Sequence, residues 1–391
     1  MRLTIALLGL LILGLVLHGR TARAVTAASP PLDSASGKSA SKPRLPASHL
    51  EARTALNEPP PETAAPASAF ARLFKDEGEL PKLSRGQVES YLAKNRRSAG
   101  SLLAAFRLTG DRALLQEAAE KHPDDPRVNF AGWTTVRMNQ DASPTERRQW
   151  LDGFKQAALD NVLRQLEALM QAAPDNALPN YLSALNYFKA GQTDQAVQQL
   201  AAAAAKPDFQ DYELDSAQSA QEAYLAAGYS MAQAKAAANF GLPIPQFARL
   251  TTLSLEMADL VRAFQQAGDD ASAQAAVQIG LDLGQRLDDP RAFSVVQNLV
   301  GAKIQSNILA AMDASSPYGD TGQTVRDQLD ALNQRCQNLK ATWLVDGGQL
   351  QPVGELVQSL SEPDLISYLD RERTFGGWTA TQWLINRQSH P

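Results

Sequence analysis

The segment from Pro174 to Pro207 constrains the fold of this chain more than any other, because its residue pattern fits two short helices joined by a turn. A Pro-Asp-Asn turn precedes the first helix, and Gly191 breaks the pattern between the two helices. Small or apolar residues recur at helical spacing on both sides of that break. They are Ala184, Tyr187, Ala196, Leu200 and Ala203.

A second segment repeats this arrangement around Gly268. Small or apolar residues occur five, nine and twelve positions after each turn glycine: Ala196, Leu200 and Ala203 after Gly191, and Ala273, Val277 and Gly280 after Gly268. A shorter match lies at 102–126, where Gly110 takes the place of the turn glycine. Equal offsets in separate places predict repeated helix pairs.

These segments resemble the tetratricopeptide repeat family, closely over 174–207 and in a degenerate form over 102–126 and 257–290. The resemblance covers about a quarter of the chain. It implies an all-α fold of antiparallel helix pairs stacked as a superhelix or solenoid, which binds other proteins on its curved surface.

The N-terminus predicts export. Arg2 precedes an uncharged run, Leu3 to Leu17, and an Ala-Arg-Ala sequence ends at Ala24. This pattern is typical of a signal peptide over 1–24. The alternative is an uncleaved membrane anchor, although the run is shorter than the roughly 20 residues of a spanning helix. Either form would place the protein in the periplasm, outside the cell, or on the inner membrane of a bacterial envelope.

A linker is expected over 25–68, because this segment holds eight of the 22 prolines and no aromatic residue. Such a segment buries too little apolar surface to fold. The repeat domain is then expected over 69–310, followed by a C-terminal helical capping segment over 311–391. Without residues 1–24 the chain has 34 basic and 42 acidic residues, a net charge of −8. A chain of this charge without a basic stripe is a poor binder of nucleic acid.

Helices are predicted throughout the folded part. Four sites place a hydroxyl three residues before an acid or amide, as helix N-caps do: Ser84, Ser143, Ser361 and Thr379. Near the C-terminus, apolar residues alternate at spacings of four and three, from Val325 through Leu332 and Cys336 to Trp343. This heptad-like seam is short for a coiled coil, so packing on the domain's own helices is favoured over a dimer.

The chain offers few residues for catalysis or metal binding. His122 is the only histidine between residues 50 and 389, and Cys336 is the only cysteine, which excludes zinc sites of the Cys/His type. No phosphate-binding glycine loop occurs. The acid pairs at 124–125, 269–270 and 288–289 are predicted to lie at helix ends and to cap them. We therefore expect no cofactor, no metal and no catalytic residue.

Counting back from Gly191 gives candidate residues for a binding groove: Tyr181, Leu185, Phe188 and Lys189. Exposed rings at Tyr181 and Phe188 would suit an apolar helix or an extended peptide. Alternatively, a neighbouring helix covers both rings. The predicted function is non-catalytic protein binding or scaffolding. The alternatives are a glycan-acting envelope enzyme with a superhelical arm, which would need a buried glutamate of raised pKa in a deep cleft, and a structural homo-oligomer.

Overall fold

The computed structural model describes residues 82–140, 155–240, 244–319, 322–343 and 352–389. The expected signal or anchor segment, the linker and the cap at Ser143 lie outside these residues. Within them, no helix combines the length and the apolar character that crossing a membrane requires.

The described chain is almost entirely helical, as predicted. Its helices are α3 (Arg85–Lys94), α4 (Ala99–Thr109), α5 (Arg112–Lys121), α6 (Pro126–Gln140), α8 (Lys155–Ala172), α9 (Leu178–Lys189), α10 (Thr193–Ala204), α11 (Glu213–Ala226), α12 (Met231–Phe240), α13 (Pro245–Gln266), α14 (Asp270–Leu287), α15 (Val295–Leu309), α16 (Val325–Trp343), α17 (Pro352–Ser359), α18 (Glu362–Phe375) and α19 (Gly377–Ser389). Two strands, β1 (Pro317–Tyr318) and β2 (Gln323–Thr324), form a short antiparallel hairpin. In the described residues this hairpin is the whole of the sheet structure.

Glycines join several helix pairs. Gly110, Gly191 and Gly268 follow α4, α9 and α13, each with φ between 72° and 74°. This left-handed backbone strongly favours glycine, which explains why these glycines mark the turns in the sequence. The residues five and nine positions after Gly191 and Gly268 are buried in both pairs. Twelve positions after, Ala203 and Gly280 are buried as well. All three offsets are therefore buried after both glycines.

Two of the predicted caps are confirmed. Ser84 forms a capping box with Gln87, and the Ser361 hydroxyl accepts a hydrogen bond from the backbone N–H of Asp364. The prediction at Thr379 is wrong, because α19 begins two residues earlier at Gly377. Gly376, at φ 91°, ends α18 there, and its Cα lies so close to the backbone of 290–291 that a Cβ would clash.

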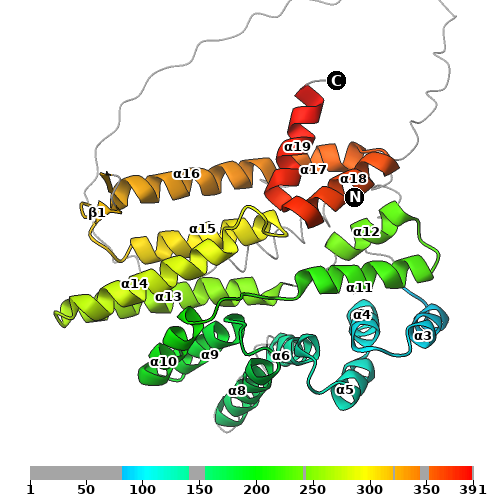
Figure 1. Ribbon diagram of the computed structural model, residues 1–391, viewed down its shortest axis with the longest axis horizontal. Helices are drawn as coiled ribbons and strands as arrows, with labels where there is room; N and C mark the ends of the chain where they lie inside the picture. Colours follow the sequence, from blue (N-terminus) through cyan, green and yellow to red (C-terminus); the bar gives the residue numbers. More distant parts are fainter. Residues whose placement is uncertain (1–81, 141–154, 241–243, 320–321, 344–351, 390–391) are drawn as a thin grey trace, which may run out of the picture.

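Helix pairs also contact partners that are distant in sequence. Helix α11 packs on α3 and α4, and α13 packs on α9 as well as on α14. Figure 1 shows α13, α14, α15 and α16 lying roughly side by side, with α8, α9 and α10 beyond α13. One apolar core joins α6, α8–α10 and α13–α16, while a second joins α3–α6, α11, α12 and α17–α19. Packing contacts are thus not limited to helices of neighbouring hairpins.

Helix α15 lies at the centre of the first core. Eleven of its fifteen residues are buried, and they surround the helix instead of forming one stripe. It contacts α13, α14 and α16. Gly284 of α14 and Gly301 of α15 allow this contact, because a Cβ on Gly301 would lie 2.6 Å from the carbonyl oxygen of Gly284.

The C-terminal seam packs on the domain itself, as favoured. Val325 and Leu332 of α16 are buried in the first core, and Cys336 is half-buried against it. Helix α18 packs on α12. Both cores therefore continue past residue 310, where the boundary of the repeat domain was expected.

Candidate functional site

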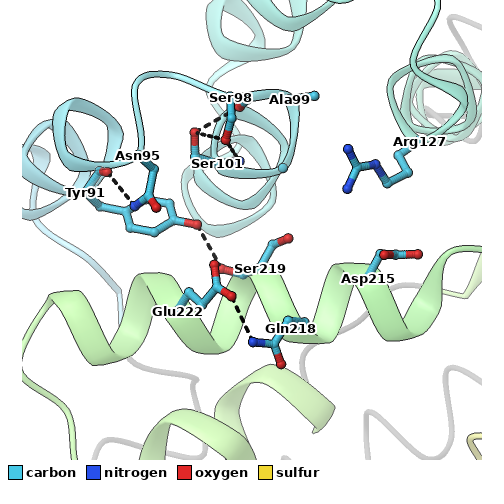
Figure 2. A pocket seen from close by; sticks show the side chains of 11 residues that line it. Tyr91, Asn95, Ser98, Ala99, Ser101, Arg127, Asp215, Gln218, Ser219 and Glu222 are labelled. Carbon is cyan, nitrogen blue, oxygen red and sulfur yellow. Dashed lines mark hydrogen bonds between the residues drawn. The ribbon is translucent and has the colours of Figure 1, made fainter.

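A polar cavity of about 290 Å³ lies between α3, α4, α6 and α11; we call it the α11 cavity. One wall is a face of α11 with residues at helical spacings of three and four: Asp215, Gln218, Ser219 and Glu222. The other side of α11 carries buried residues, including Ala217, Ala220 and Tyr224. Helix α11 therefore turns a polar stripe to the cavity and an apolar face to the core (Figure 2).

The facing wall is the start of α4. Ser98 caps this helix and accepts a hydrogen bond from the backbone N–H of Ser101, while the Ser101 hydroxyl donates to the Ser98 carbonyl at 2.9 Å. A Cβ on Gly100 would lie 3.3 Å from the Ser219 hydroxyl oxygen. The absence of a side chain at residue 100 therefore lets α4 approach α11 closely at this point.

The turn before α4 forms part of the rim and is held in an unfavourable conformation. Arg96 and Arg97 both have positive φ, at 51° and 47°, which few residues other than glycine adopt. The Arg97 guanidinium donates two hydrogen bonds to Glu117 of α5, at 2.5 and 2.6 Å, and one to Glu89 of α3, at 3.0 Å. These charged bonds compensate the backbone strain and tie the rim to two helices.

The cavity carries side chains of both charges. Arg127 of α6 lies on one side, in an ion pair with Asp125 at 2.6 Å, and that pairing raises its pKa. Asp215 and Glu222 lie on the α11 wall, with Tyr91 between the helices. The Tyr91 hydroxyl donates to the Ser219 carbonyl at 3.1 Å, and burial, aided by the Glu222 charge, raises its pKa.

This arrangement suits binding better than nucleophilic chemistry. The hydroxyls of Ser98 and Ser101 bond to each other, at 3.2 Å. Among the described residues neither bonds a histidine or a carboxylate that would remove its proton. A ligand group with both hydrogen-bond donors and acceptors could bind to the side chains of the two walls without a chemical reaction.

The residues predicted to line a groove on α9 do not form one exposed surface. Tyr181 and Leu185 are buried in the first core, Phe188 is half-buried against it, and only Lys189 is exposed. Burial also raises the pKa of Tyr181 to about 12. The expected exposure is therefore wrong for Tyr181, and its alternative, a ring covered by neighbouring helices, holds. None of the four residues lines the α11 cavity.

The sequence contains one signal for the α11 cavity. The segment 213–226 has polar residues on one helical face and alanines on another. It lacks the repeat-like offsets from which the binding residues were predicted. Its partner α4 lies more than 100 residues earlier. No local pattern indicates that contact.

The acid pairs lie at helix ends as expected, but the carboxylate of one acid, Asp288, forms an ion pair instead of capping a helix. Asp269 caps α14, and the carboxylates of Asp125 and Asp289 accept backbone N–H bonds from Arg127 and Arg291. Asp288 instead pairs with Arg335 of α16, at 2.6 Å, and its carboxylate is almost fully buried. Burial raises the pKa of Asp288 to about 6.

One buried glutamate bears on the enzyme alternative. Glu213, at the start of α11, is only 6 % exposed, and burial raises its pKa well above the usual value. The cavity beside it has a volume of about 30 Å³, which is the space of one water molecule. A sugar ring does not fit there, so Glu213 does not provide the deep cleft that glycan cleavage requires.

The described residues contain no group of three or more histidine, cysteine, aspartate or glutamate side chains placed to hold a metal ion. Comparison of the chain with family models, with curated proteins and with solved structures gave no match.

Proposed function

We propose that this protein is a non-catalytic binding or scaffolding protein of the bacterial envelope, with helix pairs stacked in a tetratricopeptide-like superhelix. The observation that supports the proposal is a pair of features shared by α9–α10 and α13–α14. Both turn at a glycine of positive φ and bury the residues at matching offsets. Repeated helix pairs are a common framework for protein binding.

The α11 cavity is the proposed site for part of the partner. Its walls offer a guanidinium, hydroxyl groups and the start of α4 for a partner's acceptors, and two carboxylates for its donors. A partner protein or peptide would insert a polar side chain or a chain end here. Export is part of the proposal and depends on residues 1–24 of the sequence, with either cleavage or anchoring there.

A capture experiment with matched variants tests this function. Asp215→Lys and Glu222→Lys, made together, reverse the charge of the α11 wall, while Asp330→Lys, at an exposed position on α16, is the control. Envelope extract of the source organism would be passed over each immobilised full chain. We expect partners that wild type and control retain and that the double variant loses, with circular dichroism equal for all three.

Two results would overturn the proposal. One is equal retention of every partner by the double variant. The other is turnover of an envelope substrate by the purified protein that a single acid-to-amide change abolishes. The mass of the mature N-terminus separately decides between a cleaved signal and a retained anchor.

A further inference from the structure

Two carboxylates and an amide meet beside the small 30 Å³ cavity at the start of α11. Asp211 and Glu213 flank Tyr212, whose φ of 59° is unfavourable for a residue with a Cβ. Gln246, in the first turn of α13, lies against both carboxylates and is only 1 % exposed. The strained residue thus connects two acids that share one buried neighbour.

The contacts among these three side chains are poor hydrogen bonds. The Gln246 Nε2 atom lies 3.4 Å from Asp211 Oδ2 and 3.5 Å from Glu213 Oε1, beyond the usual range for an N–H donor. Glu213 Oε2 and Gln246 Oε1 are buried, and among the described residues they have no hydrogen-bond partner. Buried acceptors without partners are rare in folded proteins and call for an explanation.

The two separations from the Gln246 amide, 3.4 and 3.5 Å, are close to the spacing between oxygen ligands of a calcium ion. Oxygens about 2.4 Å from calcium and at right angles to each other lie about 3.4 Å apart, whereas oxygens about 2.1 Å from magnesium lie about 3.0 Å apart. The two ends of a glutamine amide are interchangeable by rotation. Turning the Gln246 amide would therefore place its oxygen about the right distance from both carboxylates.

We propose that Asp211, Glu213 and Gln246 bind a calcium ion. Two carboxylates balance the charge of a divalent cation, and the hydroxyls of Thr134 and Ser216 line the same cavity as further oxygen donors. Asp211 is half-buried, which gives the ion a route from solvent. This inference concerns residues outside the α11 cavity and does not depend on the proposed function.

Arg107 is the basic residue on the cavity wall and limits the affinity. It is half-buried, and no hydrogen bond or ion pair joins it to either carboxylate within the described chain. Burial and the neighbouring Arg127 lower its pKa to about 10, so it is still charged at neutral pH. We therefore expect weak binding, with a Kd of about 10⁻⁴–10⁻³ M.

Calorimetric titration of the full chain at pH 7.5 with calcium chloride, and separately with magnesium chloride, tests the site. We expect one calcium ion per chain, at least tenfold weaker binding of magnesium, and a rise in Tm of a few degrees in 10 mM calcium. Glu213→Gln should weaken calcium binding at least tenfold. Asp288→Asn, which neutralises another buried acid of raised pKa outside this cavity, is the matched control and should bind like wild type.

Three outcomes would overturn the inference. The first is folded wild type that gives neither heat nor a Tm shift in 10 mM calcium. The second is equal calcium binding by wild type and Glu213→Gln. The third is a Glu213→Gln variant that is more stable than wild type, with wild-type stability independent of calcium, since the site would then hold a proton or the Arg107 guanidinium.

Discussion

Glu372 should make the protein less stable as pH rises toward neutrality. This side chain of α18 is 9 % exposed, and its Oε2 accepts a hydrogen bond from Asn239 at 2.9 Å. Burial raises its pKa to about 7, from the 4.5 of an exposed glutamate, despite the opposing effects of Asn239 and of the Arg373 charge. The folded protein therefore keeps a proton that the unfolded chain releases above pH 4.5.

The sign and size of the effect follow from this difference. The stability contribution of Glu372 is fully present below pH 4.5 and is lost as pH rises through 7. A shift from 4.5 to about 7 corresponds to about 3 kcal/mol, at 1.36 kcal/mol per pKa unit. In Glu372→Gln the amide stays neutral, and its oxygen can still accept the bond from Asn239.

The assay is urea unfolding at several pH values between 4.5 and 8. We expect wild type and Glu372→Gln to be equally stable at pH 4.5, with the variant more stable by about 3 kcal/mol at pH 8. Glu355→Gln, at an exposed position on α17, is the control and should follow wild type. A difference between Glu372→Gln and wild type that stays constant with pH would refute the reasoning.

Three further predictions concern packing and charge. The Arg97 ion pair lowers the pKa of Glu117 to about 2. The stabilisation from this pair is present above about pH 4.5 and is lost as pH falls through 2. In urea unfolding, Glu117→Gln should therefore lower the free energy of unfolding by about 1 kcal/mol at pH 7 and by almost nothing at pH 2. Gly301→Ala should lower the free energy of unfolding by about 3 kcal/mol or more, because the new Cβ meets backbone atoms at the C-terminal end of α14. Gly191→Ala, with open space around it, should lower it by only about 1 kcal/mol. Equal losses of stability would contradict the close crossing of α14 and α15. Leu332→Ala should lower stability by about 2–5 kcal/mol and leave the sedimentation coefficient unchanged, whereas a loss of dimers would restore the homo-oligomer hypothesis.

The helical class, the turn glycines and the buried offsets could be predicted from the sequence because they depend on local physics. Glycine at positive φ and apolar residues at helical spacing act within one hairpin, as at Gly191 and Leu200. Caps were predictable for the same reason at Ser84 and Ser361. The prediction at Thr379 failed because the position of Gly376, packed against residues 290–291, sets the start of α19.

The candidate sites could not be predicted, because they depend on contacts between distant helices. Tyr181 has the spacing of a groove residue, but α13, more than 60 residues later, packs on its helix. The α11 cavity requires α4 to lie against α11, and the proposed calcium site requires Gln246 of α13 to meet Glu213. The periodicity of a single sequence does not indicate which distant helices contact each other.

The burial of α15 on every side limits how the protein can be shortened. A stop codon after residue 310 would remove α16, which packs on α15, and would uncover the side of α15 that α16 now covers. Such a truncated product should aggregate or be degraded, because it would expose an apolar patch to solvent. We therefore expect the last 81 residues to be needed for solubility, so that a minimal fragment for biochemical work has to retain them.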